Sequence, residues 1–159
     1  MDQIQIVCDS GAVITLPRNV AQLSPILKSL EGDEQFPLLY GEDVFHWVKA
    51  FLEQYIVEPM SSIPLPVKYS TPLDTLVSTW YVEFLKDVPV SKVKMLFDVA
   101  CLLDIEPLVD LLAIHIGRLY ALLSKEDVRL HFGIEFNFEE QDVKIARGVL
   151  THHEQFVKV

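Results

Sequence analysis

The sequence predicts one α+β domain in which a small sheet near the N-terminus is followed by helices. Two short β-branched runs, at 4–7 and 12–16, flank a turn, and apolar residues with helical spacing follow, most clearly from residue 44 and again after residue 78. The 159 residues suffice for one compact domain that hides about 70% of the surface of the unfolded chain. A large multi-domain enzyme is therefore excluded.

The first elements follow from the β-branched runs and from one proline. The two runs should form a hairpin, because Gly11 tolerates the positive φ of a tight turn. Apolar residues from 20 to 30 keep helical spacing, but Pro25 removes a backbone donor in their middle. We therefore expect two short helices there, followed by a brief third strand at 36–39.

The clearest helical period comes next, and acids at 42 and 43 favour the positive helix start. One face of this helix should be core: Val44, Trp47, Val48, Phe51, Leu52 and Tyr55. The period ends at residue 58, where four of the nine prolines fall within 58–73. A segment this rich in proline continues neither a helix nor a central strand, so we interpret it as a long surface linker within the same domain.

After the linker the chain should be helical to its end. Residues 91–103 hold two apolar rows, which predict burial on two sides: Val93, Leu96, Phe97, Ala100 and Leu103 in one, Met95, Val99 and Leu102 in the other. Residues 108–123 are apolar nearly all round, which is typical of a central helix. Ser124 and Asn137 each precede an acid by three residues, so both should cap further helices.

Charge and composition restrict the partners. The net charge is −10, and both halves of the chain are negative, so nucleic acid and anionic membranes would repel the protein. The longest stretches without Asp, Glu, Lys or Arg have nine residues, too few to span a bilayer. Two distant cysteines and an N-terminus without a signal-peptide pattern favour a reducing compartment, the cytoplasm, the nucleus or both.

No residue pattern nominates an active site. The histidines lack the spacing of a zinc site, the glycines form no phosphate-binding loop, and no serine stands in a nucleophile elbow. Cys8 and Cys101 should behave as small apolar side chains, and Trp47 and Trp80 as packing residues. We therefore expect neither an enzyme nor a cofactor or metal; an enzyme of unknown class is the remaining alternative, without a candidate residue.

The C-terminal third has an excess of apolar side chains: Val128, Phe132, Ile134, Phe136, Phe138, Val143, Ile145, Val149, Leu150 and Phe156. Leaving five of them in water would forgo about 7–15 kcal/mol. Either the protein has one larger core or a protein partner covers these residues. Without that partner, the same surface predicts self-association, for example as a homodimer.

Four segments together resemble a known family. They are WYVEFLK at 80–86, LDIEPLVD at 103–110, SKEDVRLHFGI at 124–134 and FEEQ at 138–141. In order and spacing they are similar to the S-phase kinase-associated (Skp-type) adaptors, the small linker subunits of SCF ubiquitin ligases. The resemblance implies a BTB/POZ fold for 1–123, with a Pro-rich loop at 58–73, and a helical extension at 124–159 that receives F-box proteins.

The resemblance also implies two binding sites. The F-box site would comprise Leu112, Ile116, Leu119, Leu123, Val128, Phe132, Ile134, Phe138, Val143, Ile145 and Val149. The cullin site would comprise Cys101, Leu102 and Asp104, although the family commonly has Asn-Tyr where this chain has Cys101-Leu102. Two functions follow: an adaptor linking an F-box protein to a cullin, or a repurposed structural subunit that binds an F-box-like partner in an assembly without a cullin.

Overall fold

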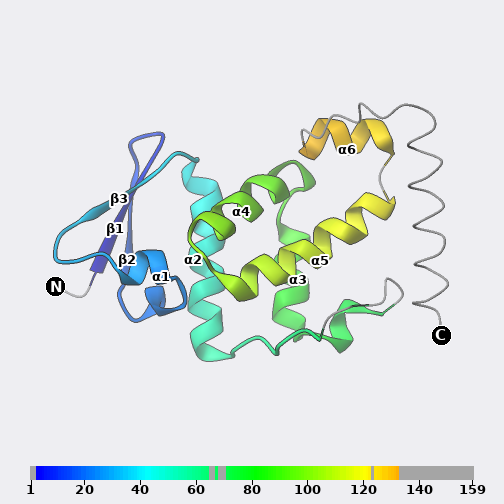
Figure 1. Ribbon diagram of the computed structural model, residues 1–159, viewed down its shortest axis with the longest axis horizontal. Coiled ribbons are helices and arrows are strands. Elements are labelled where there is room, and N and C mark those ends of the chain that lie inside the picture. Colours follow the sequence, from blue (N-terminus) through cyan, green and yellow to red (C-terminus); the bar gives the residue numbers. More distant parts are fainter. Residues whose placement is uncertain (1–2, 65–66, 68–70, 123, 133–159) are drawn as a thin grey trace.

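The computed structural model describes residues 3–64, 67, 71–122 and 124–132, and within them the predicted α+β class is confirmed (Figure 1). A three-stranded sheet stands at one end, and the larger helices extend from it. The elements in chain order are β1 Gln3–Cys8, β2 Val13–Pro17, the 3-10 helix η1 Val20–Leu23, α1 Pro25–Lys28, β3 Gln35–Leu38, α2 Glu42–Val57, the 3-10 helix η2 Leu73–Thr75, α3 Thr79–Asp87, α4 Val90–Leu102, α5 Glu106–Leu122 and α6 Lys125–Phe132.

The sheet has the order β2-β1-β3. β1 and β2 pair antiparallel, with Ile6 opposite Ile14, and Gly11 gives the connecting turn its positive φ of 85°. β3 pairs parallel to β1, because the chain crosses back through η1 and α1 before returning. Alternate residues of β1 and β2 are buried, as expected of a sheet with one face on the core. The hairpin and the brief third strand are both confirmed.

Pro25 separates two short helices, as predicted. It is the first residue of α1, where a missing N–H leaves no hydrogen bond unmade. The Ser24 side chain caps the same helix by accepting a hydrogen bond from the Leu27 N–H at 3.2 Å. Proline therefore ends one helix and starts the next.

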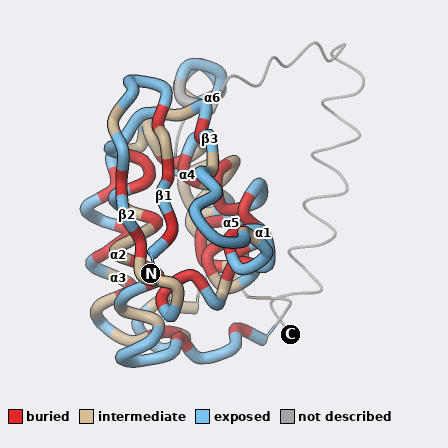
Figure 2. Tube along the Cα trace, turned by 90° about the vertical axis from the view of Figure 1, so that its left-hand side faces the viewer, coloured by how far each residue is buried: buried red, intermediate tan, exposed pale blue. Residues whose placement is uncertain are grey.

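α2 crosses the middle of the molecule and contributes most to the core (Figures 1 and 2). Four of the six predicted core positions are buried, whereas Trp47 and Tyr55 are half-buried. Phe45 is also fully buried, although it lies outside the predicted row. Phe51 sits at the centre of an aromatic cluster, with its ring centroid 5.6 Å from that of Tyr81 and 5.8 Å from that of Phe84.

The expectation of burial on two sides of α4 is confirmed only in part. The first row packs as predicted and Val99 of the second row is buried, but Met95 and Leu102 of that row are 42% and 50% exposed. α5 differs from its prediction in a similar way. Its first turns, with Leu108 and Leu111, are buried, whereas no residue from 113 to 122 is. Only the first half of α5 is therefore a central helix.

The Pro-rich segment is not a free surface linker. Its prolines at 59, 64 and 72 are exposed, but Met60 and Ile63 between them are buried in the core. The Tyr81 hydroxyl donates to the Glu58 carbonyl oxygen at 2.6 Å, and the Arg118 guanidinium donates to the Thr71 carbonyl oxygen. Both ends of the segment are thus fixed to the helices.

α6 begins at the predicted cap. The Asp127 N–H donates to the Ser124 hydroxyl oxygen at 3.2 Å, and that hydroxyl donates back to the Asp127 carboxylate at 2.8 Å. The helix lies against α4 (Figure 1). The start of the extension therefore folds back on the domain, while the helix expected after Asn137 lies outside the described residues.

Candidate protein-interaction surfaces

The predicted F-box site begins on one face of α5. Leu112, Ile116 and Leu119 are spaced by four and three residues, so the structure brings them together on that face. Leu112 is fully buried by its own chain and belongs to the core, which corrects its assignment to a binding surface. Ile116 and Leu119 are half-buried against the core and keep accessible apolar surface.

The remaining F-box residues are placed only in part. Val128 and Phe132 lie four residues apart on α6, so the helical backbone puts both positions on one face of that helix. Leu123, Ile134, Phe138, Val143, Ile145 and Val149 lie outside the described residues.

Two exposed leucines extend the apolar surface beyond the prediction. Leu122, in the last turn of α5, is 76% exposed, and Leu130 of α6 is 77% exposed. Neither had been assigned to the site. Leu130 lies within 124–134, one of the segments that resemble the Skp-type adaptors, so the resemblance could have indicated Leu130 as a binding residue.

The predicted cullin residues form an exposed corner at the end of α4. Cys101, Leu102 and Asp104 are all exposed. The Ile105 N–H donates to the Ala100 carbonyl at 3.0 Å and the Asp104 N–H to the Cys101 carbonyl at 3.1 Å, which is the Schellman arrangement. Asp104 takes the left-handed position of this motif, with φ 54°. The backbone of the corner is therefore fixed by its own hydrogen bonds.

Ser24, which lies far from this corner in the sequence, packs against it and holds it. Its hydroxyl donates to the Leu103 carbonyl oxygen at 2.5 Å while accepting from the Leu27 N–H. Ser24 is the one buried polar residue among those the structure describes. One hydroxyl thus joins the start of α1 to the end of α4.

The two thiols have different surroundings. Cys8 is buried in β1, as suits the small apolar side chain that was expected, whereas Cys101 is exposed. Partial desolvation and the nearby Asp98 carboxylate raise the pKa of the Cys101 thiol. It therefore stays protonated at neutral pH and is a poor nucleophile.

Other chemistry is sparse in the described part of the chain. Desolvation, and to a smaller degree the Arg118 charge, lower the pKa of His115, so this half-buried histidine is neutral at pH 7. The described residues contain no group of three or more His, Cys, Asp or Glu side chains placed to hold a metal ion. His152 and His153 lie outside them. No described helix has both the length and the apolar character required to cross a membrane.

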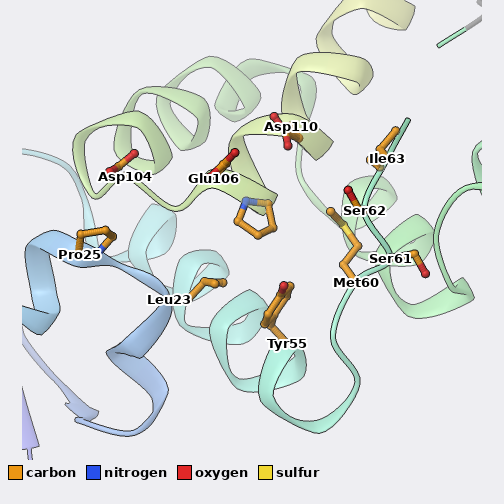
Figure 3. Close-up of a pocket in the computed structure, with 11 residues that line it drawn as sticks. Leu23, Pro25, Tyr55, Met60, Ser61, Ser62, Ile63, Asp104, Glu106 and Asp110 are labelled. Carbon is orange, nitrogen blue, oxygen red and sulfur yellow. The ribbon is translucent and has the colours of Figure 1, made fainter. Parts of the chain in front are cut away.

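A cavity of about 400 Å³ opens beside the exposed corner (Figure 3). The sequence does not predict this cavity, because its wall includes residues of the Pro-rich segment, whose composition indicates a surface linker. Its lining residues are Leu23, Pro25, Tyr55, Met60, Ser61, Ser62, Ile63, Asp104, Glu106, Pro107 and Asp110.

Comparison with known proteins does not assign the chain. No protein-family model matches it, and no curated protein matches its sequence.

Proposed function

We propose that the protein is a non-catalytic adaptor that joins an F-box protein to a cullin scaffold in an SCF-type ubiquitin ligase. The F-box partner would bind the second half of α5 together with α6 and the chain that follows. The cullin would bind the exposed corner at the end of α4. The sequence resemblance supports this proposal, and so does the order of elements, a small sheet followed by helices with α6 at the start of the extension.

The change in α5 from core helix to surface helix carries the proposal. Leu108 and Leu111 are fully buried, but the apolar residues that follow, Ile116 and Leu119 among them, are only half-buried and Leu122 is mostly exposed. An apolar helix face left in water is typical of a protein-binding site. A helical, apolar motif such as the F-box has the shape and chemistry to cover it.

The composition of the corner favours a second candidate, the structural subunit without a cullin. Cys101 and Leu102 replace the Asn-Tyr pair common in the family with side chains that offer at most a weak thiol hydrogen bond. A partner other than a cullin would then bind this corner through apolar contact.

Co-purification tests both candidates. The full chain is mixed separately with an F-box peptide and with a cullin N-terminal domain, each at micromolar concentration. Binding of both supports the ligase adaptor, and binding of the F-box peptide alone supports the structural subunit. Binding of neither contradicts both proposals.

A pair of variants tests where the F-box partner binds. Ile116→Asp places a charge on the half-buried face and should abolish F-box binding, as should Phe132→Asp on α6. Ala121→Asp is the matched control, because Ala121 is exposed on another side of the same helix. Normal binding by folded Ile116→Asp and Phe132→Asp would contradict the assigned face.

A further inference from the structure

The cavity beside the corner is formed by segments that are far apart in the sequence. Leu23 and Pro25 come from η1 and α1, Tyr55 from α2, and Met60 to Ile63 from the Pro-rich segment. The start of α5 completes the wall. Figure 3 shows Tyr55 and Met60 on one side of the hollow and the acids on the other. Its volume of about 400 Å³ is in the range of ligand-binding cavities.

The apolar side of the cavity is held in place. Met60 and Ile63 are buried, and the hydrogen bond from Tyr81 to the Glu58 carbonyl fixes the chain just before them. Pro107, in the first turn of α5, adds a rigid ring. A ligand would therefore meet a largely preformed wall, apolar at Met60, Ile63 and Pro107 and polar at the two serines between the first two, which lowers the entropy lost on binding.

The other side of the cavity is acidic. Asp104, Glu106 and Asp110 line it within seven residues of sequence. No lysine, arginine or histidine nitrogen of the described residues lies within 4.0 Å of these three carboxylates. The dipole of α5 stabilises the carboxylate of Glu106, which lies in the first turn. Asp110 lies one turn further along the same face, so its negative charge and that of Glu106 repel each other.

We propose that this cavity docks an arginine-bearing peptide segment of a protein partner. The aliphatic part of an arginine side chain packs on rings such as those of Pro107 and Tyr55, and its guanidinium reaches the carboxylates, where it makes paired hydrogen bonds. The hollow beside the acids, with its fixed apolar surface, distinguishes the site from ordinary solvated carboxylates. The inference is independent of the adaptor function, although Asp104 belongs to both surfaces.

Fluorescence anisotropy of the full chain tests the proposal. The probe is a labelled peptide, Ala-Leu-Arg-Leu-Ala amide, and its twin carries citrulline, which has the shape of arginine without the charge. We expect the arginine peptide to bind with a Kd about tenfold lower than the citrulline twin. Added salt should reduce this preference, because it screens exposed charges.

Variants locate the binding. Glu106→Gln with Asp110→Asn should remove the preference for arginine, whereas Glu53→Gln with Asp87→Asn, two exposed acids that do not line the cavity, should leave it unchanged. Asp110→Lys should instead prefer a twin peptide with glutamate in place of arginine.

Three results would overturn the proposal. The first is equal binding of the arginine and citrulline peptides. The second is that Glu53→Gln with Asp87→Asn lowers the preference for arginine as much as Glu106→Gln with Asp110→Asn does. The third is that arginine amide alone competes at the same concentration as the unlabelled peptide. The last result would mean that the cavity takes a small cation and not a peptide. None of these results depends on whether an F-box protein or a cullin binds.

Discussion

Ser24 is the residue whose single side chain serves two helices. Its hydroxyl oxygen caps α1 at the Leu27 N–H and its proton goes to the Leu103 carbonyl at the end of α4. Since Ser24 is fully buried, water cannot replace either bond without a rearrangement. The exposed corner at 101–104 therefore depends on a residue about eighty positions earlier.

Ser24→Ala should lower the free energy of unfolding by about 1–3 kcal/mol, because it removes a helix cap and leaves a buried carbonyl without its donor. Urea unfolding followed by circular dichroism measures this. Ser29→Ala is the matched control, since the Ser29 hydroxyl makes only an exposed bond to the Ile26 carbonyl. Equal losses in the two variants would contradict the role assigned to Ser24.

Asp104 stands in a backbone position that favours glycine. Its φ of 54° is in the left-handed region, where an L side chain is disfavoured. Asp104→Gly should therefore raise the free energy of unfolding by up to about 1 kcal/mol. Asp104→Asn tolerates the same backbone and removes only the charge, so it separates the two effects.

The same two variants test whether the Asp104 side chain binds a partner. If it does, both should weaken binding, although only the glycine variant gains stability. Urea unfolding and partner titration are measured on the same samples. A loss of stability in Asp104→Gly would show that the carboxylate stabilises the corner itself.

The Tyr81 phenol makes the stability of the protein depend on pH in the alkaline range. Burial, and to a smaller degree the charges of Glu58 and Tyr55, raise its pKa from 10.0 to about 12. Because the folded state holds this proton more tightly than the unfolded state, the resulting stability is fully present below pH 10. It is lost as the pH rises from 10 towards 12.

Tyr81→Phe should therefore show a smaller loss of stability between pH 10 and 12 than the unchanged chain. At pH 7 the variant should be less stable by about 0.5–1.5 kcal/mol, the usual contribution of one hydrogen bond. Urea unfolding at several pH values measures both effects. Identical pH profiles would mean that the Tyr81 phenol is not responsible for the alkaline loss.

At the scale of elements, periodicity explains which predictions are confirmed. The row on α2 was predictable because a helix that packs one face repeats apolar residues at fixed intervals. Pro25 and Ser124 were predictable because a missing donor and a helix cap act locally. Each of these features depends on residues within a few positions of one another.

The predictions that are wrong depend on distant contacts. Met60 and Ile63 show no period, so only the tertiary structure shows that they anchor the Pro-rich segment. Met95 and Leu102 have the right spacing for burial, but no element among the described residues covers them fully. The sequence does not predict the cavity for the same reason, because its residues come from four separate parts of the chain.

The whole molecule combines apolar surface with a high negative charge. Leu122 and Leu130 expose most of their side chains at the end of α5 and on α6, and the net charge is −10. Burial of apolar surface favours association of two copies, whereas their like charges oppose it. Salt screens the repulsion and leaves the apolar attraction, so the balance depends on ionic strength.

We therefore expect the protein without a partner to self-associate, and to do so more strongly at 0.5 M than at about 0.05 M salt. Leu122→Glu with Leu130→Glu should reduce the association with little change in stability, because both side chains are 76–77% exposed. Light scattering over a range of concentrations measures the self-association.

Leu39→Glu is the control, since Leu39 is 82% exposed but lies directly after β3, away from α5 and α6 in the sequence. Association abolished by the Leu39 change alone would place the self-contact at the sheet, and fully dispersed protein at high salt would contradict an uncovered binding face.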